Sequence, residues 1–487
     1  MTDLRVLSVA SEVFPLIKTG GLADVAGALP GALSTLGIAV TTMLPGYPQV
    51  MDRLSGAKVV HRWQDLFGGP AALVSVETAG LALLVLDAPH LYRRSGGPYQ
   101  DSHGADWNDN AQRFAALAFT AAELAGGLLG GDAPEVVHAH DWQAALSAVY
   151  LHFARADQPR RRPATIVTIH NIAFQGRFPA GLLKTLRLPP DAFVIDGVEY
   201  YGQIGFLKGG LALADHITTV SPTYALEIQG GEMGMGLEGL LRHRSHDLTG
   251  ILNGVDTEVW NPATDRHLVA QYDVQRLDDR QRNKVAVQQR FGLANDAPGP
   301  LVAVVSRLSW QKGMDLLLAA LPRLIAEGGQ LALLGAGDAS LQAEISAAKT
   351  RHPGRVGAVF GYDESLSHLM QGGADMILVP SRFEPCGLTQ LYGLRYGAVP
   401  LVARVGGLAD TVIDANDAAL AAGVATGFQF TPVAVQALEA ALARAARIYR
   451  DRDVWQQLQE RGMATDVSWR RPARQYAELY RFLAERR

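Results

Sequence analysis

The sequence predicts an α/β protein made of two doubly wound domains, each built on a parallel sheet. Short apolar segments rich in β-branched residues alternate along the chain with longer Ala- and Leu-rich segments. Most of the short segments are followed by Gly, Pro or Asp, as buried parallel strands in βαβ units are. The chain has 487 residues, about three times the length of a typical domain of roughly 150 residues. We therefore expect two large hydrophobic cores.

The predicted strands fall into two series, with helices expected between them. In the first half they are residues 5–10, 81–86, 136–139, 166–169 and 216–220. In the second half they are residues 301–306, 330–334, 356–360, 376–379 and 399–403. Between the series, residues 253–300 carry Asn-Gly, Asn-Pro and Pro-Gly-Pro turns and a polar run, which are typical of a linker region. We place the boundary near 250–256, so that the domains cover residues 1–250 and 251–464.

Composition excludes several classes of protein. Lys and Arg number 44 and Asp and Glu number 48, a net charge of −4, so no overall positive field attracts a nucleic acid. The single cysteine, Cys386, excludes an internal disulfide and a multi-cysteine metal site and fits a reducing cytoplasm. Because no apolar run approaches about 18 residues, we expect neither a signal peptide nor a membrane span.

A glycine-rich turn follows the first predicted strand, in the segment Lys18-Thr19-Gly20-Gly21-Leu22-Ala23-Asp24. Glycines let backbone N–H groups approach an anion closely, and the helix predicted from about Leu22 would offer its positive end. Lys18 adds a full charge, which favours contact with a phosphate or a sugar. The alternative is an ordinary strand-to-helix turn with a solvated lysine.

Two further loops follow strands of the second domain. Ser306 to Gly313 contains Arg307 and Lys312, a planar fork and a point charge suited to two adjacent phosphates; the alternative is a loop with two solvated cations. Pro380 to Gln390 contains Glu384 before a sharp turn and a helix predicted from about Leu388. This carboxylate can accept hydrogen bonds from sugar hydroxyls or, alternatively, can cap the helix.

Polar residues also end two strands of the first domain, in His138-Ala139-His140-Asp141-Trp142 and Thr168-Ile169-His170-Asn171. The paired histidines suggest a metal, but no compact ligand set accompanies them, so hydrogen-bonded strand-end residues are preferred. No Gly-Lys-Ser/Thr triplet is present, which argues against a P-loop. Gly335-Ala336-Gly337 lacks the third glycine of a dinucleotide fingerprint, which argues against a Rossmann oxidoreductase.

Taken in order, five of these segments resemble the bacterial glycogen synthases, the ADP-glucose-using α-glucan synthases related to plant starch synthases. They are Lys18 to Asp24, His138 to Trp142, Arg307 to Gly313, Glu384 to Gln390 and Gly406 to Thr411. The resemblance spans nearly the whole chain. It implies the GT-B architecture, two Rossmann-like domains facing a cleft. It also implies a last helix, Pro472 to Glu485, that completes the first domain with about residues 465–487 and an apolar face of Ala473, Tyr476, Leu479, Tyr480 and Phe482.

The resemblance also implies a role for individual residues. Lys18, Gly20 and Gly21 would approach the donor diphosphate and glucose, and Asp24, His170 and Asn253 would lie beside the transferred sugar. Arg307 and Lys312 would neutralise the diphosphate, Glu384 would orient the glucosyl hydroxyls, and the N–H groups of Leu388 and Thr389 would meet the distal phosphate. Tyr362 matches an adenine-stacking position, and Tyr99, His140, Asp141 and Trp142 are expected at the acceptor side or the cleft. Where many retaining GT-B enzymes carry a second glutamate, this sequence has Tyr392, so that glutamate's ribose contact is not carried over.

The reaction implied is transfer of glucose from ADP-glucose to the non-reducing 4-OH of an α-1,4-glucan, with release of ADP and retention at the anomeric carbon. No residue is a convincing covalent nucleophile, which favours same-face attack. A GT-B enzyme that uses UDP-glucose or a small acceptor is the alternative, and a non-catalytic glucan-binding protein of the same fold is a more distant one. We expect no metal: Asp451-Arg452-Asp453 matches a metal-binding pattern, but Asp453 is expected to cap a helix.

Overall fold

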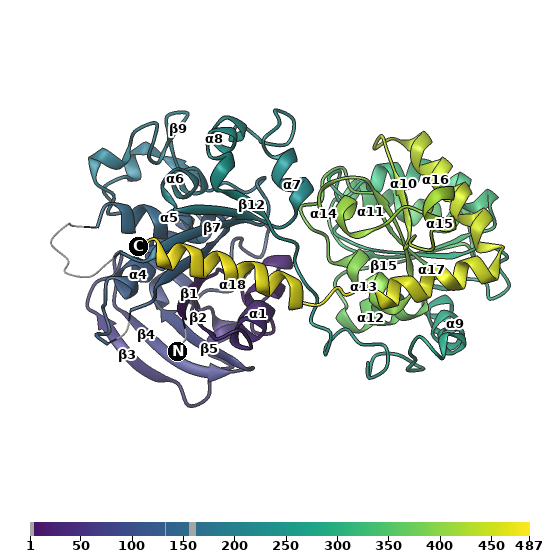
Figure 1. The fold of residues 1–487 in the computed structure, drawn as a ribbon, viewed down its shortest axis with the longest axis horizontal. Coiled ribbons are helices and arrows are strands. Elements are labelled where there is room, and N and C mark those ends of the chain that lie inside the picture. The colour runs from purple at the N-terminus through teal and green to yellow at the C-terminus, as the bar shows by residue number, and fades with distance from the viewer. Residues whose placement is uncertain (1–3, 132, 155–161) are drawn as a thin grey trace. The chain divides into compact units, whose positions relative to one another are not determined.

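The computed structural model describes residues 4–131, 133–154 and 162–487, which form two compact units (Figure 1). Unit 1 combines the chain up to Gly254 with its last segment, Trp469–Arg487, and unit 2 is Val255–Ser468. The boundary expected from the sequence, between residues 250 and 251, thus lies close to the point where the chain leaves unit 1. The chain returns to unit 1 shortly before its last helix.

Unit 1 is built on a nine-stranded sheet with the order β12-β11-β7-β6-β1-β2-β5-β4-β3. Its strands are β1 (Leu4–Val9), β2 (Ile38–Pro45), β3 (Lys58–Trp63), β4 (Ala71–Thr78), β5 (Leu81–Asp87), β6 (Val136–His140), β7 (Ala164–Ile169), β11 (His216–Thr219) and β12 (Leu248–Gly250). All five strands predicted for this half are confirmed. Neighbouring strands are parallel except at one edge, where β3, β4 and β5 pair antiparallel. The physical reason is a tight turn at Ala79 and Gly80, both with positive φ, which makes a hairpin of β4 and β5.

Helices and a small sheet complete unit 1. The helices are α1 (Gly21–Ser34), α2 (Pro48–Met51), α3 (Pro89–Tyr92), α4 (Asn110–Ala125), α5 (Asp141–His152), α6 (Phe206–Leu213), α7 (Pro222–Glu227), α8 (Glu238–His243) and α18 (Arg470–Glu485). The small sheet has the order β8-β10-β9, from strands β8 (Arg177–Pro179), β9 (Glu199–Tyr200) and β10 (Gln203–Gly205). Helices α4 and α5 pack against each other, and α5 contacts β6 and β7.

Helix α18 runs beside α1 and the strands of unit 1, as Figure 1 shows. Its buried residues Ala473, Tyr476 and Tyr480 join Val25 of α1 and Val136 of β6 in one hydrophobic cluster. The apolar face predicted for this helix is correct except at Phe482, which is 52% exposed. That side chain points away from the cluster because Tyr480 and Leu483 already fill the positions that face it.

Unit 2 is built on a six-stranded, wholly parallel sheet with the order β15-β14-β13-β16-β17-β18. Its strands are β13 (Leu301–Val305), β14 (Gln330–Gly335), β15 (Val356–Phe360), β16 (Met376–Val379), β17 (Val399–Ala403) and β18 (Phe428–Phe430). The five predicted strands are confirmed, and β18 adds an edge. Side chains of β13 alternate between two cores: residues 301 and 303 pack with α9 and α12, and residues 302 and 304 with α10 and α16.

The helices of unit 2 connect these strands. They are α9 (Arg280–Phe291), α10 (Met314–Ala326), α11 (Ala339–Arg351), α12 (Glu364–Gly373), α13 (Thr389–Tyr396), α14 (Gly406–Thr411), α15 (Asp417–Ala421), α16 (Val435–Tyr449) and α17 (Arg452–Ala464). Asp451, not Asp453, caps α17, because its Oδ1 accepts the N–H of Val454 at 3.2 Å. The helix begins earlier than the sequence suggested, which places Asp453 in its first turn.

Parallel strands bring their carboxyl ends to one edge of a sheet. In unit 1 the segments that follow β1, β6, β7 and β12 therefore share an edge, and in unit 2 so do those that follow β13, β15, β16 and β17. Most of the candidate site residues lie in these segments. Among the described residues, no helix has the length and apolar character needed to cross a membrane.

Candidate active site

In unit 1, the glycine turn after β1 holds a charged pair. Lys18 Nζ lies 2.9 Å from Asp24 Oδ1, and both side chains are about one-quarter exposed or less (24% and 21%). The alternative of a freely solvated lysine is therefore wrong. Helix α1 begins at Gly21 with Gly20 as its N-cap, which has no side chain to occupy the first N–H groups. This helix end can therefore offer backbone donors to an anion.

Gly20 is not required by the packing of the chain itself. Its φ of −158° is extended backbone that any residue adopts, and a Cβ added there would meet no atom within 4 Å. The local fold would thus accept alanine. A glycine at such a position leaves room for a molecule that approaches the backbone closely.

Three polar side chains form a hydrogen-bonded row at the ends of β1, β6 and β7. His140 Nε2 lies 3.1 Å from Ser8 Oγ, and His140 Nδ1 lies 2.9 Å from His170 Nε2. Burial lowers the pKa of His140 to about 3, and burial, together with His140, holds the pKa of His170 well below its usual value. Both imidazoles are therefore neutral at pH 7, so that His170 can act as a hydrogen-bond partner but not as a cation.

Asp141 holds the backbone of the turn that carries His170. Its backbone is in the left-handed region at φ +56°, and its Oδ1 accepts the backbone N–H of His170 at 2.7 Å and that of Asn171 at 3.4 Å. Burial raises the pKa of Asp141 to about 7. This residue holds the turn after β7 rather than facing a ligand.

His140, Asp141 and Trp142, expected at the acceptor side or the cleft, have their side chains packed within unit 1. All three are buried, and the Trp142 ring packs against Phe114, Phe178 and Phe206. They turn inward because β6 is a central strand covered by α5, so its end lies inside the core. Tyr99 is half-buried, and its hydroxyl contacts Ser11 and Glu12.

Two further residues of unit 1 bear on the site. Asn253, after β12, is 8% exposed, and its Oδ1 has no hydrogen-bond partner among the described residues, which is unusual for a buried polar atom. Glu12, which the sequence analysis missed, accepts hydrogen bonds from Thr19 and Tyr99. The signal that could have revealed it is its place, an acidic residue three positions after the end of a buried strand.

In unit 2, Lys312 and Glu384 form an ion pair. Lys312 Nζ lies 2.6 Å from Glu384 Oε2, which also accepts the hydroxyl of Ser381 at 2.8 Å. The sequence assigned the two side chains separate tasks, and the structure joins them. Glu384 is only 8% exposed, so it neither reaches solvent nor caps α13, whose N-cap is Leu388.

Glycines fix the segment that carries this pair. Gly313 has a φ of +67°, and a Cβ there would lie 2.0 Å from the carbonyl oxygen of Pro380. A Cβ on Gly406, at φ +42°, would lie 2.0 Å from the carbonyl oxygen of Glu384. Gly407 donates its N–H to that same oxygen at 3.1 Å. Gly313, the N-cap of α10, and the first two glycines of α14 therefore let two helix starts pack directly on the backbone around Glu384.

The remaining predicted residues of unit 2 are open to solvent or lie at a helix start. Arg307 is exposed after β13, and Tyr362 after β15 is 77% exposed. Thr389 begins α13 and Leu388 precedes it without a capping side chain, so the first N–H groups of α13 are available to an anion. Trp310, which the sequence analysis did not single out, is 63% exposed with the Arg382 guanidinium 4.3 Å from its ring centroid.

The aromatic surroundings of position 392 favour tyrosine over a carboxylate. The Tyr392 ring stacks on Trp260 with centroids 3.6 Å apart and planes at 12°, and His368 stacks on Trp260 at 3.8 Å and 10°. Tyr392 is thus part of a packed aromatic stack. A glutamate there would bury a charge against rings.

Within the described ranges, no group of three or more His, Cys, Asp or Glu side chains could hold a metal ion. The ring nitrogens of His138 bond to Tyr480 and Thr168, and those of His140 bond to Ser8 and His170. The histidines that suggested a metal are thus engaged in hydrogen bonds.

Two doubly wound domains, each with glycine turns, cations and open helix starts at the carboxyl edge of its sheet, define a glycosyltransferase of the GT-B class. Residues 5–243 match the family described as starch synthase catalytic domain, and residues 287–461 match glycosyl transferases group 1. The chain belongs to the glycogen synthase family.

Relatives of known name support this assignment over the full length. A glycogen synthase of Rhodopseudomonas palustris (strain BisA53) is 61% identical over 99% of this chain and 98% of that protein. A glycogen synthase of Methylocella silvestris is 57% identical, with each chain covered in full. The structure of the catalytic domain of starch synthase IV from Arabidopsis thaliana, bound to ADP and acarbose, aligns with a TM-score of 0.91 at 33% identity, covering 99% of this chain and 100% of that one.

Proposed function

We propose that this glycosyltransferase transfers glucose from ADP-glucose to the non-reducing 4-OH of an α-1,4-glucan, releases ADP and retains the configuration at the anomeric carbon. The observation that carries the proposal is the Lys312–Glu384 pair beside the uncapped start of α13. It is supported by the full-length likeness to glycogen synthases and by a related plant structure that is bound to ADP. A cytoplasmic location follows from the proposed donor and from the single cysteine.

We assign the nucleotide diphosphate to unit 2. Arg307 and Lys312 supply two positive charges, and the first N–H groups of α13, at Leu388 and Thr389, supply donors aligned with the helix dipole. The exposed ring of Tyr362 offers a face on which adenine can stack. When a diphosphate draws Lys312 toward it, a Glu384 oxygen is released to accept hydrogen bonds from glucosyl hydroxyls.

We assign the transferred sugar to unit 1. Lys18 and the backbone of Gly20 and Gly21 lie at the start of α1, where they can meet the phosphate and the glucose. Asp24, the neutral imidazole of His170 and the unpaired Oδ1 of Asn253 are suited to sugar hydroxyls. These are short polar groups on rigid strand and helix ends, which favours precise orientation.

In the proposed mechanism no residue is a covalent nucleophile. The bond between the anomeric carbon and the β-phosphate oxygen breaks, and the acceptor 4-OH attacks on the same face. The departing phosphate oxygen takes the acceptor proton, so ADP leaves and the new α-1,4 bond retains the configuration. Stabilising the leaving diphosphate is then the main catalytic task, and Arg307, Lys312 and the start of α13 carry it. We propose that no metal ion takes part.

The proposal is tested by measuring nucleotide release from ADP-glucose and UDP-glucose, with and without glycogen. We expect ADP release that depends on glycogen, with a much lower rate from UDP-glucose. Lys312→Ala is the matched variant, and its kcat and kcat/KM should fall together because the lysine acts on the developing charge of the leaving group. Faster release from UDP-glucose, or release that a small acceptor supports better than glycogen, would overturn the proposal.

A further inference from the structure

Glu12 is a buried carboxylate directly behind the glycine turn of unit 1. Glu12 is only 2% exposed. One oxygen accepts the backbone N–H of Thr19, and the other accepts the hydroxyl of Thr19 at 2.5 Å and the hydroxyl of Tyr99. In the part of the chain that the structure describes, no Lys, Arg or His nitrogen lies within ion-pair distance of Glu12. The Glu12 oxygens are therefore engaged by hydrogen-bond donors of Thr19 and Tyr99, as a buried carboxyl group requires.

Tyr99 reaches Glu12 from a segment that is itself anchored. Ser11 Oγ lies 2.8 Å from the Tyr99 hydroxyl, and Asn110 Nδ2 donates to the Tyr99 carbonyl oxygen at 2.9 Å. The Tyr99 ring packs against the Phe114 ring, with 5.9 Å between their centroids. Both ends of this tyrosine are thus held, one by the segment that follows β1 and the other by α4.

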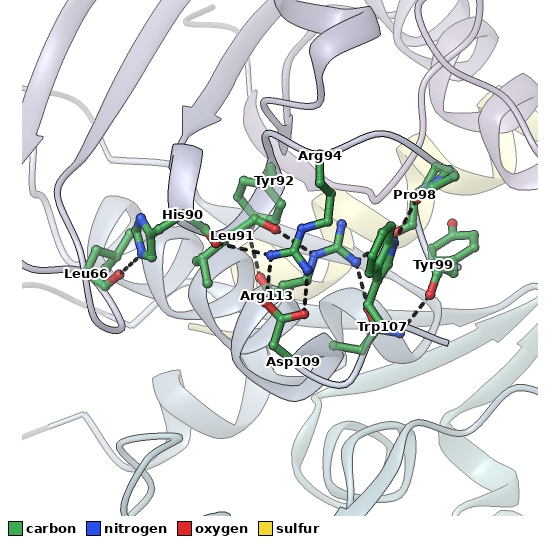
Figure 2. A network of polar contacts seen from close by, with 12 residues as sticks. Leu66, His90, Leu91, Tyr92, Arg94, Pro98, Tyr99, Trp107, Asp109 and Arg113 are labelled. Carbon is green, nitrogen blue, oxygen red and sulfur yellow. Dashed lines mark hydrogen bonds and ion pairs between the residues drawn. The ribbon is translucent and has the colours of Figure 1, made fainter. Parts of the chain in front are cut away.

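Arg113 of α4 is the anchor of that segment, as Figure 2 shows. It is fully buried (0% exposed), and its Nη1 donates to the carbonyl oxygen of Pro98 at 2.8 Å and to Oδ1 of Asn110 at 2.7 Å. Its Nε donates to the carbonyl oxygen of Leu91 at 2.9 Å. The side chain therefore ties the residues before and after Tyr99 to one rigid point on a helix.

A second clamp holds the outer part of the same segment. Arg94 forms a bidentate pair with Asp109, at 2.8 and 2.7 Å between nitrogen and oxygen atoms. Its guanidinium also lies 4.9 Å from the centroid of a Trp107 ring. Figure 2 shows these contacts beside those of Arg113. The segment from Leu91 to Asn110 is thus built to keep Tyr99 in place rather than to move.

The geometry points to Glu12 as the residue that positions the turn of residues 18–21. Tyr99, which Arg113 holds through its neighbours, keeps the Glu12 side chain in place. By occupying the N–H of Thr19, Glu12 sets the direction of the backbone that follows and leaves the N–H groups of Gly20 and Gly21 to face a ligand at the start of α1. This inference rests on the proposed function, in which that turn binds the sugar nucleotide. It assigns Tyr99 a task inside the protein rather than at the acceptor.

The test compares Glu12→Gln with a matched control, Glu135→Gln. Glu135 also accepts a backbone N–H, that of Arg5 at 2.9 Å, but at the opposite end of β1. An amide group replaces one oxygen of Glu12 by a donor, which would oppose the donors of Thr19 and Tyr99. We expect backbone hydrogen exchange in residues 17–22 to speed up on the order of tenfold. The KM for ADP-glucose should rise by on the order of tenfold with kcat changed less, since uniform binding is lost.

Glu135→Gln should leave both the exchange of residues 17–22 and the KM as in the wild type. Tyr99→Phe removes one donor and should shift both in the same direction by less, which keeps the inference testable if Glu12→Gln does not fold. Unchanged exchange and KM in Tyr99→Phe and in a folded Glu12→Gln would overturn it, as would an equal loss of kcat in both glutamate variants. Backbone hydrogen exchange is measured without substrate. A wild-type protein that released no ADP would therefore refute the proposed function, whereas the exchange of residues 17–22 would still decide this inference.

Discussion

The Lys312–Glu384 pair places opposite charges within 2.6 Å in a part of unit 2 that is largely shielded from water. Two opposite charges in such a setting depend on each other, because removing one leaves the other buried without a partner. Ser381 adds a hydrogen bond to the same Glu384 oxygen. Substitutions here are therefore expected to affect both catalysis and folding, and the two effects need separate measurements.

Replacing Glu384 by alanine should lower turnover by two orders of magnitude or more, about 3 kcal/mol in transition-state stabilisation. It should also lower Tm, because Lys312 would lose its partner. Measuring kcat and Tm for Glu384→Ala, Lys312→Ala and the double variant separates the effects. The double variant should be less destabilised than the sum of the single ones. Additive Tm losses, or a near-native kcat in Glu384→Ala, would contradict this prediction.

Gly20 and Gly406 give opposite predictions for the same substitution. Gly20→Ala should change Tm little, since its Cβ meets nothing within 4 Å, and should raise the KM for the sugar nucleotide because the new methyl group would stand where the proposed ligand approaches. Gly406→Ala should lower Tm strongly, because its φ is +42° and its Cβ would lie 2.0 Å from the Glu384 carbonyl oxygen. Thermal unfolding and donor titration check both. A large Tm loss in Gly20→Ala would show that the fold itself needs this glycine.

At the scale of elements, β6 and β7 bring three histidines into the core of unit 1. Burial holds the pKa of His138 and of His170 well below the usual value and lowers that of His140 to about 3. Below about pH 6.5 the unfolded chain binds protons that the folded chain does not, so unfolding becomes easier as pH falls. Asp141 opposes this trend: its folded pKa of about 7 means that the folded chain keeps a proton that the unfolded chain loses above about pH 4.

The sign of each contribution can be checked by measuring Tm at pH 7 and pH 5 for each variant against itself. His138→Gln should lose less stability than the wild type on going to pH 5, since one buried base is gone, at most about 1.4 kcal/mol less per pH unit. Asp141→Asn should lose more, because the group that gains stability toward acid is removed. Equal changes in all three proteins would contradict the assignment.

At the scale of the whole molecule, the chain leaves unit 1 at Gly254 and returns to it at Trp469. Trp469 and, in helix α18, Tyr476 and Tyr480 are then buried against α1 and the sheet. A large apolar side chain contributes about 1.5–3 kcal/mol when it is fully buried. The C-terminal segment is therefore a structural part of unit 1 that comes from the far end of the sequence.

Removing residues 469–487 should unfold unit 1 while the unfolding transition of unit 2 survives, as calorimetry would show. Phe482→Ala is the matched control on the same helix, because Phe482 is 52% exposed and should cost little. A truncated protein with both transitions intact would show that α18 is dispensable.

The metal-free mechanism also makes a prediction for the complete enzyme. Activity should withstand thorough chelation, because in the proposed mechanism Arg307, Lys312 and the start of α13 supply the positive charge that a diphosphate needs. Asp451→Ala should cost about 1 kcal/mol of stability, as a lost N-cap does, with activity unchanged. Activity lost on chelation and restored by magnesium, but not in a variant that lacks Asp451 and Asp453, would overturn the metal-free mechanism.

The local sequence pattern alone was enough to predict ten of the strands and the loops that carry the candidate site residues. All ten predicted strands are present, because a buried parallel strand is a short continuous apolar run bounded by turn residues. The loops of Lys18, Arg307 and Glu384 lie where the sequence placed them, since polar residues after such a run must stand at the carboxyl edge of the sheet. Strands β2, β3, β4, β12 and β18 and the small sheet were missed. Strands β3, β12 and β18 lie at sheet edges and those of the small sheet have two or three residues, so they lack a long apolar run. In β2 and β4 the apolar run is interrupted by Thr41, Thr42 and Ser75.

Tertiary structure alone decided which side chains meet. Lys312 and Glu384 are separated by 72 residues, Tyr99 and Glu12 by 87, and His138 and Tyr480 by 342. No local pattern encodes such partners, because they are chosen by strand order and by which helix covers which face. The same holds for Trp142, whose position after β6 does not reveal that its ring packs against Phe114 of α4, Phe178 of β8 and Phe206 of α6. Burial and pairing belong to the packed chain, whereas strand ends and turns are properties of a few consecutive residues.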